Sequence, residues 1–286
     1  MKDVNSQMEI IKGLIGCDFD GVVNDDGCLS RGIVIDGGRL IFKFPRNKDV
    51  SYRTEIENLR FLNDLNLGVK LQKVAYESVN DEYLGIYGVK GCSLADTQLS
   101  DADHIYVGKQ LGKFLKKLHN VNKENRDDLP LLDEIIAWQN RVTAVESFIA
   151  SLLNNKEQAI LRALMFDYMP KALETLGERI VFSHGDLGDE NIIIDKDKHV
   201  GIIDFNESGF LDEGADFMDL TNEILVDTML DAYGADEALR KKVEIRRDIR
   251  PIIVLEPFLV RNDEKRVDNA IKGMHSTINK YSFLLY

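Results

Sequence analysis

The stretch from residue 183 to residue 205 constrains the fold more than any other part of the chain. It opens with a polar segment, Ser-His-Gly-Asp-Leu-Gly-Asp-Glu, and continues into two apolar runs at 191–195 and 200–205. A turn-like Lys-Asp-Lys-His separates these runs, and a strand-like run at 179–183 precedes the loop. Short apolar runs bounded by turn residues are typical of strands. The pattern therefore predicts a loop, a strand, a turn and a second strand that ends at Asp204.

The acidic and amide residues of this stretch have an informative spacing. Asn191 follows Asp186 by five positions, and Asp204 follows it by eighteen. This is the spacing of a kinase catalytic loop, in which the aspartate meets the acceptor hydroxyl and the asparagine holds a metal ion. ATP and GTP carry bunched negative charge that Mg²⁺ must neutralise, while a carboxylate orients the attacking oxygen. We predict Asp186 as the catalytic residue, Asn191 and Asp204 as Mg²⁺ ligands, and ATP or GTP as phosphoryl donor.

The order His184-Gly185-Asp186, four residues, Asn191, then Ile-Asp-Phe resembles the aminoglycoside phosphotransferase family. Gly185, where protein kinases usually carry arginine, favours this small-molecule branch. The resemblance implies an α+β, protein-kinase-like, two-lobed fold. Residues 1–90 would form a nucleotide-binding lobe with a small antiparallel sheet and one helix. Residues 91–286 would form a larger, mainly helical lobe with the catalytic loop and the acceptor site.

The resemblance also implies roles for residues outside the loop. Lys43, in Leu-Ile-Phe-Lys-Phe-Pro, resembles the third-strand lysine that meets the nucleotide phosphates. Glu55 resembles its partner on the following helix, although Glu57 is close enough in sequence to take that place. The helix that ends in Leu-His at 118–119 fits the family pattern. Asp212 and Asp216 fall where the family has acids after the metal-binding aspartate.

Two further nucleotide-binding segments are predicted from position along the chain. The segment after the strand-like run 83–87 is interpreted as a hinge, so Tyr87 and Val89 are expected to pair with the base through their backbone. Ser30 lies in the presumed phosphate-covering loop at 24–32, which has two glycines but no G-x-G-x-x-G. Asn206 follows Phe205 where kinases usually have glycine. The sequence therefore leaves the backbone conformation at Asn206 undecided, because glycine adopts positive φ at lower cost than asparagine does.

The net charge of −13 argues against nucleic-acid binding, which requires a basic surface. Residues 181–230 hold thirteen acids against two lysines, so they carry −11 of that charge. If these acids surround the loop, they attract a polycation such as an aminoglycoside; acids exposed to solvent are the alternative. Asp189, Glu190 and Glu207 are the predicted substrate contacts.

Composition indicates a globular protein, with 44% apolar and 30% charged residues. The longest apolar run is too short to span a bilayer, and the N-terminus lacks a signal-peptide core, so we expect no membrane partner. Cys17, Cys28 and Cys92 have no metal-ligand spacing and read as free thiols in a reducing cytoplasm. We expect a cytoplasmic monomer.

Periodicity predicts the remaining elements. Ser51 is expected to cap a helix that carries Glu55, and Trp138 is expected in a core. His119 is expected to have a structural role at a helix end, and His184 to fix the loop by hydrogen bonding. Strands are expected at 19–24, 32–36, 39–44, 69–76 and 83–87, and helices at 5–16, 102–119, 131–153, 156–176, 216–232, 236–248 and 252–281 with a break.

Three functions follow from these predictions. The first is transfer of a terminal phosphoryl group to a hydroxyl of an aminoglycoside. The second is the same reaction on another small molecule, such as choline, homoserine, a sugar or a macrolide. The third is a catalytically silent nucleotide-binding module, against which the presence of Lys43, Asp186, Asn191 and Asp204 argues.

Overall fold

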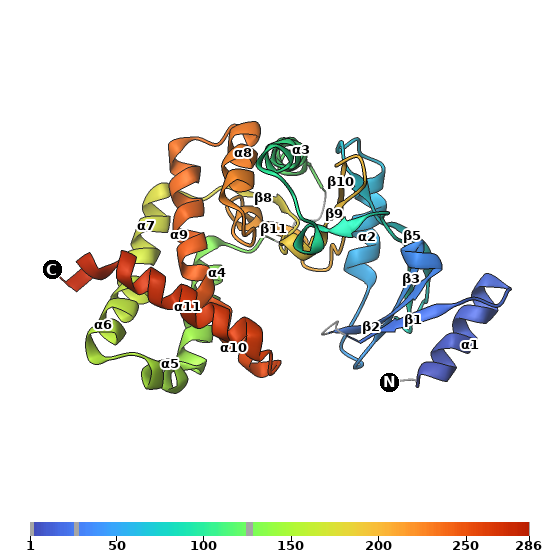
Figure 1. Cartoon of the computed structure of the whole chain (residues 1–286), viewed down its shortest axis with the longest axis horizontal. Helices are drawn as coiled ribbons and strands as arrows, with labels where there is room; N and C mark the ends of the chain where they lie inside the picture. Colours follow the sequence, from blue (N-terminus) through green and yellow to red (C-terminus); the bar gives the residue numbers. More distant parts are fainter. Residues whose placement is uncertain (1–2, 26–28, 124–127, 286) are drawn as a thin grey trace. The chain divides into compact units, whose positions relative to one another are not determined.

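The computed structural model describes residues 3–25, 29–123 and 128–285. Their contacts divide the chain into two compact units that alternate along the sequence (Figure 1). The first unit combines the described parts of 1–117 with 188–208 and 222–232, and the second combines the described parts of 118–187 with 209–221 and 233–285. The predicted lobe boundary at residue 90 stays a prediction, because these units are interleaved rather than consecutive.

The first unit contains a five-stranded antiparallel sheet. Its order is β1 (Gly21–Asn24), β2 (Ser30–Ile35), β3 (Leu40–Pro45), β6 (Leu84–Tyr87) and β5 (Lys73–Glu77). Successive side chains of a strand face opposite sides of the sheet. In β3 this alternation buries Leu40, Phe42 and Phe44, and it places Lys43 on the other face. The buried face packs against Ile11 of α1 (Val4–Ile15), which Asp3 caps by accepting from the Ser6 N–H.

Helix α2 (Arg53–Asn63) follows β3 and packs against β5. The prediction that Ser51 caps this helix is confirmed in part: Tyr52 is the N-cap residue, and the Ser51 hydroxyl accepts the Arg53 N–H at 3.3 Å. Asp81, from the turn between β5 and β6, accepts the Tyr52 N–H at 2.9 Å and the Ser51 hydroxyl at 2.9 Å. A carboxylate at this position satisfies a donor of the first turn and favours the positive end of the helix dipole.

A second sheet of the first unit contains the predicted hairpin. Its order is β4 (Lys70–Leu71), β10 (Val200–Ile202), β9 (Ile192–Ile194) and β7 (Cys92–Ser93). Helix α3 (Asp101–Leu118) and helix α8 (Glu223–Tyr233) approach closely at Gly108. A Cβ atom there would lie 2.7 Å from the Leu225 carbonyl oxygen. Glycine at this position therefore permits the contact of the two helices.

The second unit is mainly helical. Its core contains Trp138, as expected, beside the fully buried Arg246, whose guanidinium carbon lies 5.0 Å from the centre of the Trp138 ring. Arg246 donates to both carboxylate oxygens of Glu134 and to Asp212. The elements of the unit are α4 (Leu131–Ala144), α5 (Glu146–Leu152), α6 (Asn155–Ala163), α7 (Met169–Leu176), β8 (Ile180–Ser183), β11 (Gly209–Asp212), α9 (Glu237–Ile253), α10 (Leu255–Val260) and α11 (Glu264–Lys280).

Two predicted helices differ from the structure. The run 131–153 is two helices, because Val145 leaves the helical conformation at φ −113°. The helix predicted from 216 starts only at Glu223. Asp216 lies instead in a short 3-10 turn, where its carboxylate is used by the backbone of the loop at 184–185. Periodicity alone does not reveal this use.

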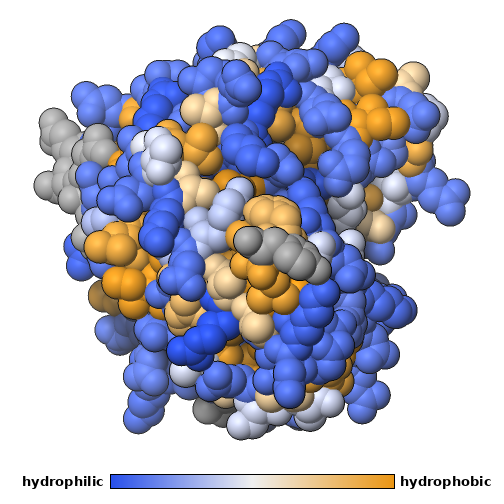
Figure 2. Space-filling view, turned by 90° about the vertical axis from the view of Figure 1, so that its left-hand side faces the viewer, coloured by the Kyte–Doolittle hydropathy of each residue, from blue (hydrophilic) through white to orange (hydrophobic). Residues whose placement is uncertain are grey.

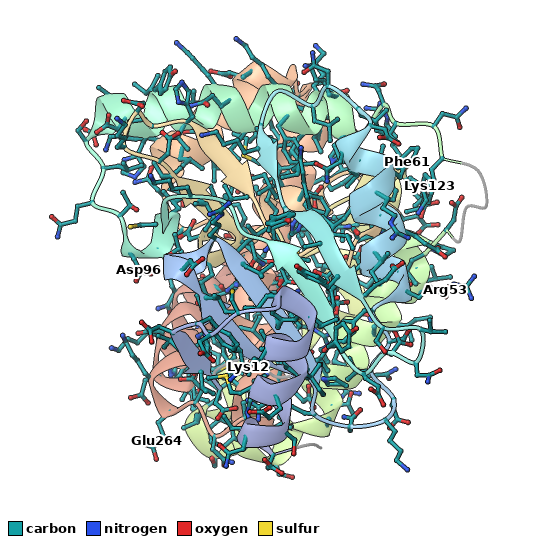
Figure 3. The ribbon with its side chains drawn as sticks, turned by 90° about the vertical axis from the view of Figure 1, so that its right-hand side faces the viewer. Lys12, Arg53, Phe61, Asp96, Lys123 and Glu264 are labelled. Carbon is teal, nitrogen blue, oxygen red and sulfur yellow. The ribbon has the colours of Figure 1, made fainter. Side chains whose placement is uncertain are left out.

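The molecular surface is mostly hydrophilic on the face shown in Figure 2, with hydrophobic patches between the polar regions. In Figure 3, Arg53 on α2 points outward, and the side chains of Arg53 and of Lys12 on α1 are exposed. Within the described ranges, every helix is too short or too polar to cross a bilayer.

Candidate active site

Lys43 is the centre of a charged cluster in the first unit. Its ammonium group lies 2.7 Å from Oε1 of Glu55 and 3.0 Å from Oδ1 of Asp204. The Glu55 side chain has no exposed surface and that of Lys43 is 15% exposed, whereas 40% of the Asp204 side chain is exposed. Glu57, the alternative partner, pairs with Arg53 on the surface. The structure therefore selects Glu55 as the carboxylate next to Lys43.

The pKa values of this pair are shifted by burial and by mutual attraction. Burial alone would lower the pKa of Lys43, but the carboxylates of Glu55 and Asp204 outweigh it and raise that pKa above its ordinary value. Burial raises the pKa of Glu55, and Lys43 opposes this shift. Oε2 of Glu55 is buried and has no hydrogen-bond partner among the described residues. Lys43 therefore stays a cation in the neutral range.

The β9–β10 hairpin explains why Asn191 and Asp204 belong together. Ile192 pairs with Ile202, and the Ile203 N–H donates to the Asn191 carbonyl oxygen at 3.0 Å. Asp204 is the next residue, so the two predicted metal ligands come from the same end of one hairpin. Asn191 ends a 3-10 turn (Asp189–Asn191) that leads into β9. Antiparallel register thus converts a sequence separation of thirteen residues into proximity.

The donors at this end of the hairpin fit Mg²⁺. A carboxylate and an amide oxygen are hard oxygen ligands, which Mg²⁺ prefers in sites shared with substrate phosphates. Mg²⁺ keeps several waters and takes one or two carboxylates from the protein, so the half-exposed Asp204 is an appropriate ligand. Lys43 already places a positive charge against Asp204 Oδ1.

The first half of the catalytic loop belongs to the second unit, and the division between the units falls between Leu187 and Gly188. Asp216 organises this half. Its Oδ2 accepts the His184 N–H and its Oδ1 accepts the Gly185 N–H, both at 2.9 Å. Gly185 has φ 84°, a conformation that glycine adopts without strain. The exposed Asp186 follows, and its N–H donates to Nδ1 of His184 at 3.3 Å.

His119 and His184 both hold this loop. Nε2 of the buried His119 lies 3.0 Å from Oδ2 of Asp216, and its Nδ1 lies 2.9 Å from the Tyr233 hydroxyl. His119 therefore contacts side chains rather than the last carbonyls of α3. Burial would raise the pKa of Asp216, but its hydrogen bond with His119 and the backbone donors hold that pKa below its ordinary value.

The predicted nucleotide contacts lie in the first unit. Tyr87 ends β6, and the Gly88 N–H donates to the Arg39 carbonyl oxygen at 3.1 Å. A Cβ at Gly88 would lie 2.0 Å from the Gly38 carbonyl oxygen, so this hinge position requires glycine. Val89 lies against Gly201 of β10.

Ser30 begins β2, and its hydroxyl lies 2.7 Å from the Tyr52 hydroxyl. Residues 26–28 of the presumed phosphate loop, with Cys28, lie outside the described residues, whereas Cys17 and Cys92 are exposed free thiols. The roles of Ser30, Tyr87 and Val89 stay predictions.

The acidic segment at 181–230 is less uniform than its sequence indicates. At least five of its thirteen acids pair with lysine or arginine: Asp195, Asp204, Asp212, Glu213 and Asp219. Asp212 is fully buried between Lys242 and Arg246 and acts as a structural residue. Asp189 is half-buried, while Glu190 and Glu207 are exposed. Internal pairing therefore reduces the field that this segment offers to a cationic substrate.

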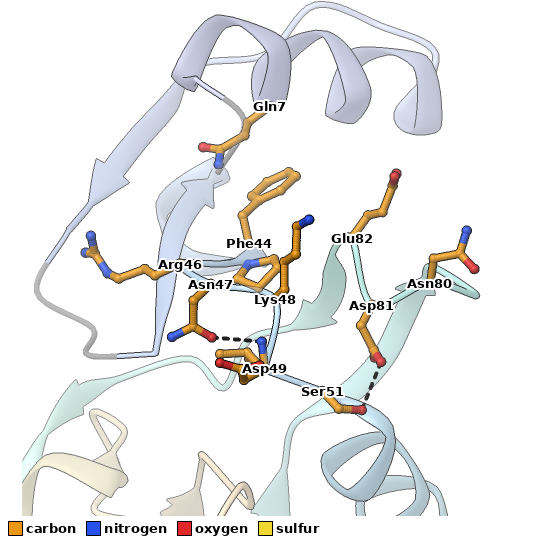
Figure 4. Close-up of a pocket in the computed structure, with 12 residues that line it drawn as sticks. Gln7, Phe44, Arg46, Asn47, Lys48, Asp49, Ser51, Asn80, Asp81 and Glu82 are labelled. Atoms are coloured by element: carbon orange, nitrogen blue, oxygen red, sulfur yellow. Dashed lines mark hydrogen bonds between the residues drawn. The ribbon is translucent and has the colours of Figure 1, made fainter.

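A separate cavity of about 480 Å³ lies beside the β3–α2 loop (Figure 4). Its lining includes Gln7 of α1, Phe44 of β3, Lys48, and the pair Ser51 and Asp81 that starts α2. Lys43, Glu55 and Asp204 are not among its lining residues. Its lysine, arginine and acidic side chains are mixed. We therefore place the chemistry at Lys43 and the hairpin rather than in this cavity.

Sequence reasoning missed the polar residues that support the site. Gln72, between β4 and β5, accepts the Asp204 N–H at 3.0 Å. Asn58 donates to Ser208 just beyond Asp204. Asn58 does leave a signal, since it shares the buried face of α2 with Leu59 and Leu62. An amide at a core position is buried only with hydrogen-bond partners.

A strand lysine paired with a helix glutamate, a hairpin that carries the two predicted metal ligands, and a His-Gly-Asp loop are the features of a kinase-type phosphotransferase. The model of the "Phosphotransferase enzyme family" matches residues 31–247, and the chain belongs to this family. The resemblance predicted from the sequence is thereby confirmed.

Solved structures support the same fold. The chain is similar to APH(2")-IIia in complex with GDP and kanamycin, with 19% identity, a TM-score of 0.79, and coverage of 97% of this chain and 99% of that one. It is also similar to macrolide 2'-phosphotransferase MphH from Brachybacterium faecium (16% identity, TM-score 0.68, coverage 95% and 98%). Choline kinase LicA from Streptococcus pneumoniae gives 18% identity, a TM-score of 0.65, and coverage of 95% and 99%. These likenesses confirm the predicted α+β, protein-kinase-like fold.

Proposed function

We propose that this protein is a nucleoside-triphosphate-dependent small-molecule kinase whose acceptor is a hydroxyl of an aminoglycoside. The observation that carries the kinase assignment is the contact of Lys43 with both Glu55 and Asp204, beside a hairpin that also supplies Asn191. Fold relatives are named for aminoglycosides, for a macrolide and for choline, and some were solved with GDP or ADP. The nucleotide donor and the small acceptor are supported by this range of relatives.

In the proposed reaction, Asp186 accepts the proton of the acceptor hydroxyl as the oxygen attacks the terminal phosphorus. A new P–O bond forms, the bond to the bridging oxygen breaks, and ADP or GDP leaves with that electron pair. Lys43 binds the phosphates, and Glu55 holds its ammonium in place. Asn191 and Asp204 would hold Mg²⁺, which neutralises phosphate charge. Asp216 keeps Asp186 oriented by fixing the two preceding backbone N–H groups.

The aminoglycoside acceptor is supported by the cationic nature of that class and by acids near the loop. Asp189, Glu190 and Glu207 are the proposed contacts for its amines. The silent-module alternative is disfavoured because Lys43, Asp186, Asn191 and Asp204 are all present. A monomeric, cytoplasmic enzyme stays the prediction from the sequence.

The proposal is tested by incubating the protein and Mg²⁺ with ATP or GTP and a panel of acceptors. The panel contains aminoglycosides, macrolides, choline, homoserine and sugars, and mass spectrometry detects the gain of one phosphate. We expect this gain on an aminoglycoside and its absence in the matched Asp186→Asn variant. A gain confined to a neutral acceptor would replace the acceptor class, and no gain on any acceptor would favour the silent module.

A further inference from the structure

Asp204 has a backbone conformation that is unusual for a residue other than glycine. Its φ is 64°, in the left-handed region that side chains other than glycine rarely adopt. Such conformations persist only where neighbouring groups determine them, and they are frequent at functional sites. The structure must therefore contain groups that hold Asp204.

The backbone of Asp204 is held by Gln72. Oε1 of Gln72 accepts the Asp204 N–H at 3.0 Å, and Gln72 is 3% exposed. The Gln72 carbonyl oxygen accepts a side-chain N–H of Asn63 on α2 at 2.7 Å. Asn63 also donates to Leu59 of its own helix at 2.8 Å. The hydrogen bonds run from α2 through Gln72 to the predicted metal ligand.

A second set of hydrogen bonds holds the segment that follows Asp204. Nδ2 of Asn58, on α2, donates to the Ser208 hydroxyl at 2.7 Å and to the Ser208 carbonyl oxygen at 3.2 Å. The Ser208 hydroxyl donates to the Phe205 carbonyl oxygen at 2.6 Å. Asn58 and Phe205 are almost completely buried. Both ends of the segment are thus tied to the helix that carries Glu55.

These contacts differ in kind from the ion pair of Asp204 with Lys43. The ion pair uses the carboxylate, which a metal ion would also use. The contact with Gln72 uses only the backbone N–H, so it is compatible with metal binding. The contact with Gln72 therefore does not compete with what the carboxylate binds.

We propose that Gln72 is a positioning residue for metal binding. Its side-chain oxygen fixes the left-handed backbone of Asp204 and so sets the direction of the carboxylate, while Asn63 ties it to α2. This inference rests on the proposed function for its metal ion. A purely structural role for Gln72 would affect stability but not metal affinity.

The test measures Mn²⁺ affinity by electron paramagnetic resonance in the presence of a non-hydrolysable ATP or GTP analogue, so that no turnover is needed. Gln72→Met removes the acceptor at similar length, and Gln72→Glu retains an oxygen. The matched control is Gln110→Met. Gln110 accepts the Val200 N–H at 3.2 Å and donates to the Lys198 carbonyl oxygen at 2.8 Å, at the far end of β10.

We expect Gln72→Met to weaken Mn²⁺ binding by roughly 10- to 100-fold, the usual effect of removing a partner of a metal ligand. Gln72→Glu and Gln110→Met should bind as the wild type does. Equal losses in the two methionine variants, or no loss in Gln72→Met, would overturn the inference. If Gln72→Met does not fold, Asn63→Leu decides the inference, because it removes the hydrogen bond to the Gln72 carbonyl oxygen. We expect a smaller loss of Mn²⁺ affinity in this variant, and an unchanged affinity would overturn the inference.

The same measurements distinguish a failure of the proposed function from a failure of the inference about Gln72. No Mn²⁺ binding by the wild type would overturn both the metal assignment and this inference. Mn²⁺ binding without phosphorylation of any acceptor would leave the inference supported by the variants and remove only the proposed activity.

Discussion

Asp216→Ala should damage the catalytic loop more than any other change at a buried acid of the second unit. The carboxylate accepts the N–H groups of His184 and Gly185 at 2.9 Å and contacts Nε2 of His119. Asp216 is 1% exposed, so water cannot replace these bonds without rearrangement. An unsatisfied buried donor costs about 1–3 kcal/mol, so two of them give about 2–6 kcal/mol of lost stability. This is a large part of the stability of a typical domain.

Asp216→Asn is the milder form of the same change. The amide keeps one oxygen, so at least one of the two backbone N–H groups loses its acceptor. The lost bond is one to a charged group, worth about 1.5–3 kcal/mol. The pKa of Asp216 lies below its unfolded value. Its contribution to stability is therefore complete above that value, about pH 4, and is lost as the pH falls through the folded pKa. In Asp216→Asn this acid-dependent part should disappear.

Urea unfolding from pH 3 to pH 7, with turnover measured on the folded fraction, checks both statements. The matched control is Asp212→Asn, which breaks a buried ion pair with Lys242 and Arg246 but does not contact the loop. We expect the Asp212 variant and both Asp216 variants to lose stability. Only the Asp216 variants should lose turnover per folded molecule. Equal turnover in the Asp212 and Asp216 variants, or unchanged stability in Asp216→Ala, would refute the reasoning.

Three further predictions concern the site itself. Asp186→Asn should lower turnover by about 10²- to 10⁴-fold with little change in nucleotide affinity, and steady-state kinetics with nucleotide titration would expose an unaffected enzyme. Asp204→Asn, which tolerates the left-handed backbone, should weaken Mg²⁺ binding by at least about 100-fold while the melting temperature stays near that of the wild type; activity restored by moderate Mg²⁺ would count against the ligand assignment. Neutralising Asp189 and Glu190 to Asn and Gln should raise the KM of the acceptor more than it lowers kcat, with a reduced salt dependence, because screening shortens from about 8 Å at physiological ionic strength to about 3 Å at 1 M; calorimetric affinities that are flat with salt in both proteins would favour a neutral acceptor.

Local patterns predicted the elements that carry the site. The strand expected at 39–44 became β3, in which Lys43 lies on the face opposite the buried side chains. The turn-bounded apolar runs after Asn191 became the β9–β10 hairpin. These features depend on neighbours in sequence, and period-two alternation and turn residues are enough to encode them.

Contacts between distant residues could not be predicted in the same way. Gln72 meets Asp204 across 132 positions, and nothing in its neighbourhood distinguishes it from a surface glutamine. Asp81 accepts the Tyr52 N–H at the start of α2 from the turn between two strands, beside the predicted Ser51. Asp216 interrupts a run with helical periodicity because its carboxylate is used by the backbone of the loop. In each case a tertiary hydrogen bond overrides or supplements the local pattern.

The charge pattern of the sequence indicated a cationic substrate, but it did not indicate the strength of the negative field that this substrate would meet. Counting acids in the segment 181–230 treats all of them as one field. Asp212 is instead neutralised in a core, and Asp195 pairs with Lys70 on the surface. Only structure separates such internal pairs from acids that a substrate can reach.

The most direct test of the central claim follows the terminal phosphoryl group. The protein is mixed with Mg²⁺, an aminoglycoside, and ATP or GTP labelled with ¹⁸O on the terminal phosphate, and the products are separated by mass spectrometry. We predict that the label appears on the aminoglycoside in equal amount to the nucleoside diphosphate formed, and that Asp186→Asn loses both. Label found only in inorganic phosphate, or transfer that persists in Asp186→Asn, would contradict the assignment.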